Sequence, residues 1–315
     1  MKKILVFIVL ILAVALVCLI PFKQQKMINI KVQYFIALQQ LLQPENWRKW
    51  QPEIKQAWEK DSVQVKLTKN KLKKTFTYAA PKILLLVNNE QGFAFNILKD
   101  IYGKVNSYTY IAIPKLIDNT ANIIVVTRTS IVKLLYEFFI NNSTQTDIIS
   151  LKNYLEDPRQ YYGFDIRRTM VTDSNIVVEK KRILVKNKSL EIAQTEQDLK
   201  AYIQQQNLKI VQPVIADIRN IGQDSLRLMI GLPINKQTVS GGKIQFMHQP
   251  PHGHMLIGFY NGRYGGRQKL YLAMKTYIAD HNLSSPEDAY EKYLDNKIPV
   301  SDTSWVRLQV NFPIF

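Results

Sequence analysis

A pattern that occurs twice in the last third of the chain constrains its fold more than any other feature. Tyr202-Ile203, three further residues and Asn207-Leu208 recur as Tyr277-Ile278, three further residues and Asn282-Leu283. A sequence that repeats itself over this distance is typical of two related units joined in tandem. We therefore expect one domain built from two similar modules.

Each module is predicted to hold a helix followed by a strand. Apolar residues recur at helical spacing in the first half of each copy, which gives the helix one apolar stripe. Apolar and polar residues then alternate over 226–232 and over 306–312, as in a half-buried strand. A single helix on a small sheet buries too little apolar surface to fold alone, so we expect the two sheets to join around a shared groove.

Further motifs in this region carry a resemblance to a known family. They are Gly262-Arg263-Tyr264, the repeated helix end, the segment 289–294 and the closing Phe312-Pro313-Ile314. On these residues, 176–315 resembles a GyrI-like effector-binding domain of the AraC type. The resemblance implies a duplicated α+β fold that holds small hydrophobic or cationic molecules in its cleft, and a few similar proteins are hydrolases.

The ligand site is predicted at Glu291. Similar domains often carry an acidic group that meets the ligand, and Glu291 occupies that place on a segment with helical spacing. A carboxylate among aromatic rings attracts a lipophilic cation. The alternative is a solvated glutamate that pairs with Lys292 or Lys297. Under both hypotheses Glu291→Gln leaves the melting temperature nearly unchanged. The other candidate ligand-binding residues are Tyr260, Tyr264, Tyr290 and Tyr293.

The chain begins with a candidate membrane anchor. Residues 4–20 are apolar and uncharged, Lys2 and Lys3 precede them, and Pro21 follows. We interpret 1–26 as an uncleaved transmembrane signal anchor, with a cleaved signal peptide as the alternative. The charges place the amino end in the cytoplasm and the soluble domains on the outer, periplasmic face of the inner membrane.

The segment 27–157 is predicted to form an α+β domain of its own. A short helix at 32–42 precedes alternating runs that indicate antiparallel strands, and a closing helix follows. The turn Asn46-Trp47-Arg48-Lys49-Trp50 and this order of elements resemble the START-like, polyketide-cyclase-like (SRPBCC) helix-grip fold. The tryptophans are expected to pack in the core, with a pocket wall as the alternative. Residues 158–175 are interpreted as a partly ordered connector to the second domain.

Composition and motif searches exclude several other functions. The net charge of +17 suits an anionic envelope, whereas no recognition helix, helix-turn-helix or zinc finger supports nucleic acid. Cys18 is the only cysteine and lies in the apolar run. His248, His252 and His254 fall on an expected exposed turn rather than in a metal site. We predict no catalytic residue and no cofactor.

The sequence thus favours a membrane-anchored protein that binds or senses a small hydrophobic or cationic ligand and is not an enzyme. The alternatives are a structural or protein-interaction module of the bacterial envelope and an extracytoplasmic hydrolase.

Overall fold

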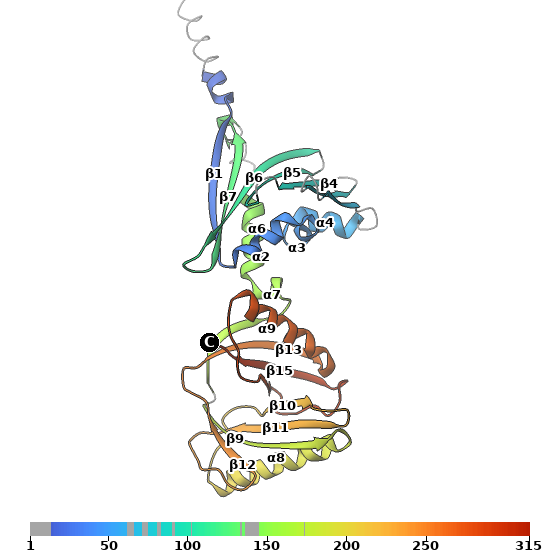
Figure 1. The fold of residues 1–315 in the computed structure, drawn as a ribbon, viewed down its shortest axis with the longest axis vertical. Coiled ribbons are helices and arrows are strands. Elements are labelled where there is room, and N and C mark those ends of the chain that lie inside the picture. The colour runs from blue at the N-terminus through green and yellow to red at the C-terminus, as the bar shows by residue number, and fades with distance from the viewer. Residues whose placement is uncertain are drawn as a thin grey trace, which may run out of the picture. The chain divides into compact units, whose positions relative to one another are not determined.

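The computed structural model describes residues 14–315 except 62–65, 71–74, 81–82, 90–91, 102, 133, 136–144 and 173. The chain divides into two compact units, 1–157 and 158–315 (Figure 1). The apolar run predicted as an anchor falls largely on 1–13, outside the described residues. Among the residues that are described, no helix is long and apolar enough to cross a membrane.

The first unit is a seven-stranded antiparallel sheet in the order β1-β7-β6-β5-β4-β3-β2 (Figure 1). Three helices follow β1, and a further helix follows β7. This order confirms the predicted antiparallel sheet and closing helix. The elements are β1 Phe22–Ile30, α2 Tyr34–Leu42, α3 Pro44–Trp50, α4 Pro52–Asp61, β2 Lys66–Asn70, β3 Thr75–Ala80, β4 Ile83–Asn89, β5 Ala94–Ile101, β6 Lys104–Lys115, β7 Thr120–Thr129 and α6 Gln145–Glu156.

The core of the first unit contains both tryptophans of the Asn-Trp turn. The side chain of Trp47 is fully buried, that of Trp50 is nearly so, and their ring centroids lie 4.4 Å apart. Trp47 also donates a hydrogen bond from its indole nitrogen to the carbonyl oxygen of Leu41, which fixes the turn between α2 and α3. The predicted packing role of this pair is confirmed.

The second unit is an eight-stranded antiparallel sheet in the order β12-β9-β11-β10-β14-β15-β13-β8. Its elements are α7 Pro158–Tyr161, β8 Ile166–Met170, β9 Asn175–Leu184, η2 Val185–Asn187, α8 Lys188–Gln205, β10 Ile215–Asn220, β11 Ser225–Pro233, β12 Ile244–His248, β13 His254–Arg263, η3 Tyr264–Arg267, α9 Gln268–Asp280, β14 Tyr290–Tyr293 and β15 Trp305–Pro313.

The predicted duplication is present in this sheet. A strand, a helix and two strands form the first module as β9-α8-β10-β11, and β13-α9-β14-β15 repeat that order. The modules meet in the middle of the sheet, where β10 pairs with β14. Figure 1 shows α8 beside β9 and β11, and α9 beside β13 and β15. The buried side chains of both helices and of the sheet face below them form one core.

The repeated asparagine has a conformational cause. Asn207 and Asn282 have φ angles of 52° and 51°, in the left-handed region that asparagine tolerates better than most residues. The next amide, from Leu208 or Leu283, donates to the carbonyl oxygen of Ile203 or Ile278. Each helix therefore ends in a Schellman motif, which accounts for the pattern that first revealed the duplication.

Two segments form strands that the sequence did not predict. Residues 22–26, assigned to the anchor, pair with β7 as the start of β1, because an exposed edge strand is held by backbone hydrogen bonds and needs no apolar pattern. Residues 166–170, assigned to the connector, form β8 and pair with β13 at the edge of the second sheet. The segment interpreted as a connector, 158–175, falls in the second unit.

Candidate functional site

A groove opens on the helical face of the second sheet, at the junction of the modules. Strand β14 pairs with β10 through only two residues, Ala216 and Ile215, so the sheet is incomplete beyond them. A cavity of about 760 Å³ and one of about 350 Å³ lie side by side here and share four lining residues. We call the two cavities together the groove; the shared residues are Ile218, Arg219, Arg267 and Gln268.

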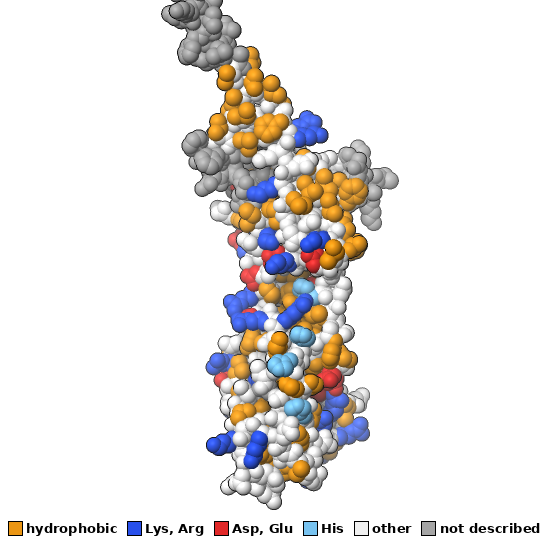
Figure 2. All heavy atoms as spheres, turned by 90° about the vertical axis from the view of Figure 1, so that its left-hand side faces the viewer, with side chains coloured by type: hydrophobic (Ala, Val, Ile, Leu, Met, Phe, Trp, Pro, Cys, Tyr) orange, Lys and Arg blue, Asp and Glu red, His pale blue; other side chains and the backbone are white. Residues whose placement is uncertain are grey.

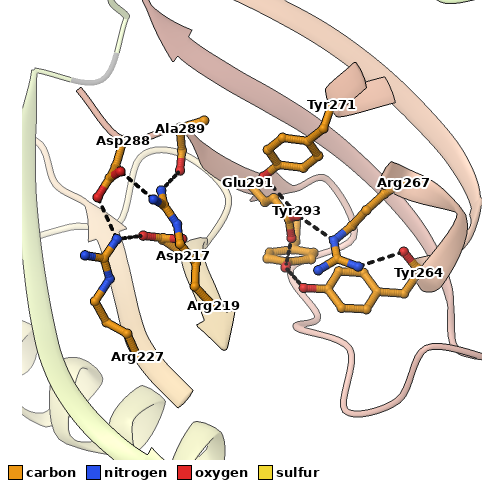
Figure 3. Close-up of polar contacts among 10 residues, drawn as sticks. All are labelled: Asp217, Arg219, Arg227, Tyr264, Arg267, Tyr271, Asp288, Ala289, Glu291 and Tyr293. Atoms are coloured by element: carbon orange, nitrogen blue, oxygen red, sulfur yellow. Dashed lines mark hydrogen bonds and ion pairs between the residues drawn. The ribbon is translucent and has the colours of Figure 1, made fainter. Parts of the chain in front are cut away.

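Glu291 lies at the narrow end of the groove and is 4% exposed. One of its carboxylate oxygens accepts hydrogen bonds from Arg267 Nε at 2.7 Å and from the Tyr271 hydroxyl at 3.1 Å. The other accepts a hydrogen bond from the Tyr293 hydroxyl. Figure 3 shows these donors converging on Glu291. Both oxygens are thus satisfied, as a buried carboxylate requires.

Arg267 connects this carboxylate to an aromatic ring. Its guanidinium carbon lies 3.5 Å from the ring centroid of Tyr264, a cation-π distance, and it donates to the Tyr264 carbonyl oxygen at 3.0 Å. Burial is the largest single effect and lowers the pKa of Arg267, but the charge and hydrogen bond of Glu291, together with Tyr264 and Tyr293, outweigh burial and raise the pKa. For the hydroxyls of Tyr264, Tyr271 and Tyr293, burial first and Glu291 second raise the pKa, so these groups stay protonated donors.

A second charged cluster lies beside the groove, which its members Asp217, Arg219 and Asp288 line. Arg219 donates to Asp217 at 2.6 Å, to Asp288, and to the carbonyl oxygen of Ala289 at 2.9 Å. Arg227 donates to the same two carboxylates, at 3.0 and 2.6 Å. Figure 3 shows this cluster next to the Glu291 cluster. These contacts fix the segment before β14, and hence the position of Glu291, against β10 and β11.

The structure brings three of the five predicted site residues together and separates two. Glu291, Tyr264 and Tyr293 meet, with Tyr293 and Tyr264 hydroxyls 3.4 Å apart. Tyr290 packs on the opposite face of the sheet with Ile176 and Met255. Tyr260 donates to the carbonyl oxygen of Arg263, next to the turn before α9.

The predicted helical segment around Glu291 is wrong, because Tyr290–Tyr293 is strand β14. All four of its side chains are buried, so it lacks the alternation that identifies a half-buried strand. The alternative of a solvated glutamate paired with Lys292 or Lys297 is also wrong, since Glu291 is buried and pairs with Arg267. Sequence reasoning missed Arg267, at the end of η3, and Tyr271, on α9. No sequence motif marks either residue as part of a site, beyond their position near other tyrosines.

The histidine cluster lies where the sequence predicted it. His248 ends β12 and His254 begins β13, and both side chains are exposed, as is that of His252. Figure 2 shows the histidines, in pale blue, spread along one face of the second unit. Across the described part of the chain, no group of three or more His, Cys, Asp or Glu side chains is placed to hold a metal ion.

The first unit also contains a buried charged pair. Lys99 on β5 lies 2.5 Å from Asp147 on α6, and Gln51 donates to the same carboxylate at 3.1 Å. Both charged side chains are almost fully buried, which ties the closing helix to the sheet. Removing one partner of such a pair is destabilising, whereas the intact pair is weak evidence for a functional site.

No family model matches this chain, and no curated protein matches it. Among solved structures, it is similar to the EcmrR C-terminal domain, with 14% identity over 48% of this chain and 98% of that one and a TM-score of 0.37. An uncharacterized conserved protein from Listeria innocua is 11% identical over 48% of this chain and 92% of that one, with a TM-score of 0.37. The di-domain ARO/CYC BexL from the BE-7585A biosynthetic pathway is 10% identical over 93% of this chain and 85% of that one, with a TM-score of 0.33.

Proposed function

We propose that the second unit binds a small hydrophobic or cationic molecule in the groove between α8 and α9. The observation that carries this proposal is Glu291, a buried carboxylate at the end of an open groove, surrounded by phenol rings. A buried charge is costly to a fold, and proteins retain such groups more often at sites that use them. The rings of Tyr264, Tyr271 and Phe312 supply apolar contact area for the ligand.

A cationic ligand has to compete with Arg267 for Glu291. When the guanidinium leaves the carboxylate, it keeps its contact with the Tyr264 ring and carbonyl oxygen, so the displaced charge is still stabilised. The ligand cation then takes the place of Arg267 beside the two tyrosine hydroxyls. Arg267 thereby favours cations that also bring apolar surface, because a small hydrated ion gains too little to displace it.

The proposal takes the groove as a binding site and not as the active site of a hydrolase. Both oxygens of Glu291 already accept hydrogen bonds from protein donors, which leaves this carboxylate poorly placed to activate a water molecule. A ligand that only exchanges partners with Arg267 requires no chemical step.

The proposal includes attachment of the protein to a membrane through the run 4–20, with both units on the outer face. The exposed apolar side chains of Val14, Leu16, Val17, Leu19 and Ile20 support this, since a bilayer would cover them. The run is about as long as the shortest membrane-spanning helices. Extraction of membranes with alkaline carbonate tests it: retention in the pellet is expected, and full release into the supernatant would contradict attachment.

Calorimetric titration of the full chain with phenylbutylammonium, phenylbutanol and phenylbutyrate tests the binding site. These probes share one shape and differ in charge. We expect Glu291→Gln, which removes the charge that the ammonium group would meet, to weaken the ammonium probe by about tenfold or more and phenylbutanol less than twofold. Tyr277→Phe on α9 is the control and should change affinity less than twofold. Equal effects of the two variants would contradict the proposal.

A further inference from the structure

The wide end of the groove differs in charge from the end that holds Glu291. Its cavity of about 760 Å³ lies where η2 leads into α8 and η3 leads into α9, and β10 and the segment around Val300 complete its wall. Among its described lining residues, four are basic, Lys186, Lys188, Arg219 and Arg267, and one is acidic, Asp302. This end of the groove is therefore electropositive.

Three of these four cations are already stabilised. All three guanidinium nitrogens of Arg219 donate to the two aspartates and to Ala289. Arg267 is held by Glu291 and Tyr264. Lys186 is exposed, so water solvates its ammonium group.

Lys188 differs from the other three cations. It is partly buried, and it forms no ion pair with any residue that the structure describes; its ammonium nitrogen lies 5.4 Å from the ring centroid of Tyr264. Burial lowers its pKa, and Arg267 lowers it further, while Asp302 and Glu291 act from a distance in the opposite direction. The cavity thus contains a cation that a nearby anion would stabilise, and the open volume beside it accepts one.

We propose that the wide end of the groove binds an acidic group of the ligand, a carboxylate or a phosphate, with Lys188 as its direct partner. Arg267, on the same tyrosine ring, adds positive charge next to this anion. This inference rests on the proposed function, because it assigns a second contact within the same groove. It implies that the natural ligand carries an acidic group and a separate apolar or cationic part that reaches Glu291.

The test compares the full chain with Lys188→Met and Lys188→Arg in titrations with phenylbutyrate and phenylbutanol. Methionine keeps the length of the side chain and removes its charge. We expect Lys188→Met to weaken phenylbutyrate about ten- to a hundredfold, and phenylbutanol less than twofold. Lys188→Arg keeps the charge and should retain most of the affinity. Lys200→Met, an exposed charge removal on the same helix, should change neither ligand.

The possible results separate the two proposals. If phenylbutyrate binds Lys188→Met as tightly as it binds the wild type, or if both probes weaken equally, the acidic-group site is contradicted while binding in the groove stands. If phenylbutanol or phenylbutylammonium binds and phenylbutyrate does not, the acidic-group site is again contradicted while binding in the groove stands. If none of the three probes binds the wild-type chain at millimolar concentration, the proposed function and this inference fail together.

Discussion

The substitution Glu291→Gln has a different expected effect once the structure is known. From the sequence, it was expected to leave thermal stability nearly unchanged. In the structure, Glu291 and Arg267 form an ion pair whose side chains are 6% and 12% exposed. The amide removes the negative charge and retains the size of the side chain, so that Arg267 is left buried without a counter-charge.

The expected loss of unfolding free energy follows from this burial. Removing one partner of a buried ion pair costs about 3 to 5 kcal/mol. Arg267 keeps the Tyr264 ring and carbonyl oxygen, and the glutamine oxygen still accepts a hydrogen bond, so we expect the lower end, about 3 kcal/mol. Arg267→Met leaves Glu291 unpaired and should cost a similar amount. The double variant should cost about 2 kcal/mol less than the sum of the two single ones.

Urea unfolding of the full chain measures these losses of unfolding free energy. Unfolding of the second unit is followed by hydrogen exchange in peptides from α9 and β15. Glu196→Gln is the matched control, because it removes the partner of Lys200 from an exposed pair on α8 and should cost less than about 0.5 kcal/mol. A loss for Glu291→Gln no larger than that of the control would refute the reasoning, as would additivity in the double variant.

Three further predictions concern packing, pH and the edge strand. Gly258→Ala should destabilise the second unit by about 1 to 3 kcal/mol, because its new methyl group would lie within 2.8 Å of two α9 side chains; an effect as small as that of Gly222→Ala in urea would contradict this. Burial lowers the pKa of His281 to about 4. As the pH falls, the unfolded state therefore binds a proton at a higher pH than the folded state does. The unfolding free energy should fall by roughly 1 to 2 kcal/mol between pH 6.5 and 4, after allowance for solvent screening. His281→Gln should abolish this dependence, and an unchanged pH profile would exclude it as the source. A chain of 158–315 should melt at a higher temperature than one of 176–315, which lacks β8; equal melting temperatures would show that β8 adds nothing.

The duplicated architecture was predictable because its signals are local. Apolar residues at helical spacing predict α8 and α9, alternation predicts β11 and β15, and the left-handed asparagines mark the helix ends. The family-level assignments, GyrI-like and START-like, stay predictions, whereas the two antiparallel sheets are observed.

The details of the site were less predictable because they depend on contacts between distant segments. Strand β14 is four residues long and buried on both faces, so its sequence has no period that distinguishes a strand from a helix. The partner of Glu291 is Arg267, on the turn before α9, and no local pattern identifies this pair. Strand β8 was missed for a related reason: five residues at a sheet edge, three of them exposed, give little alternation.

The most direct test of ligand binding at Glu291 is amide hydrogen exchange of the full chain, with and without saturating phenylbutylammonium. Binding in the groove predicts slower exchange in β14, in η3 and in the first turns of α9, and unchanged exchange in the first unit and in β12. Protection confined to the first unit or to β12, with β14 and α9 unaffected, would contradict the central claim.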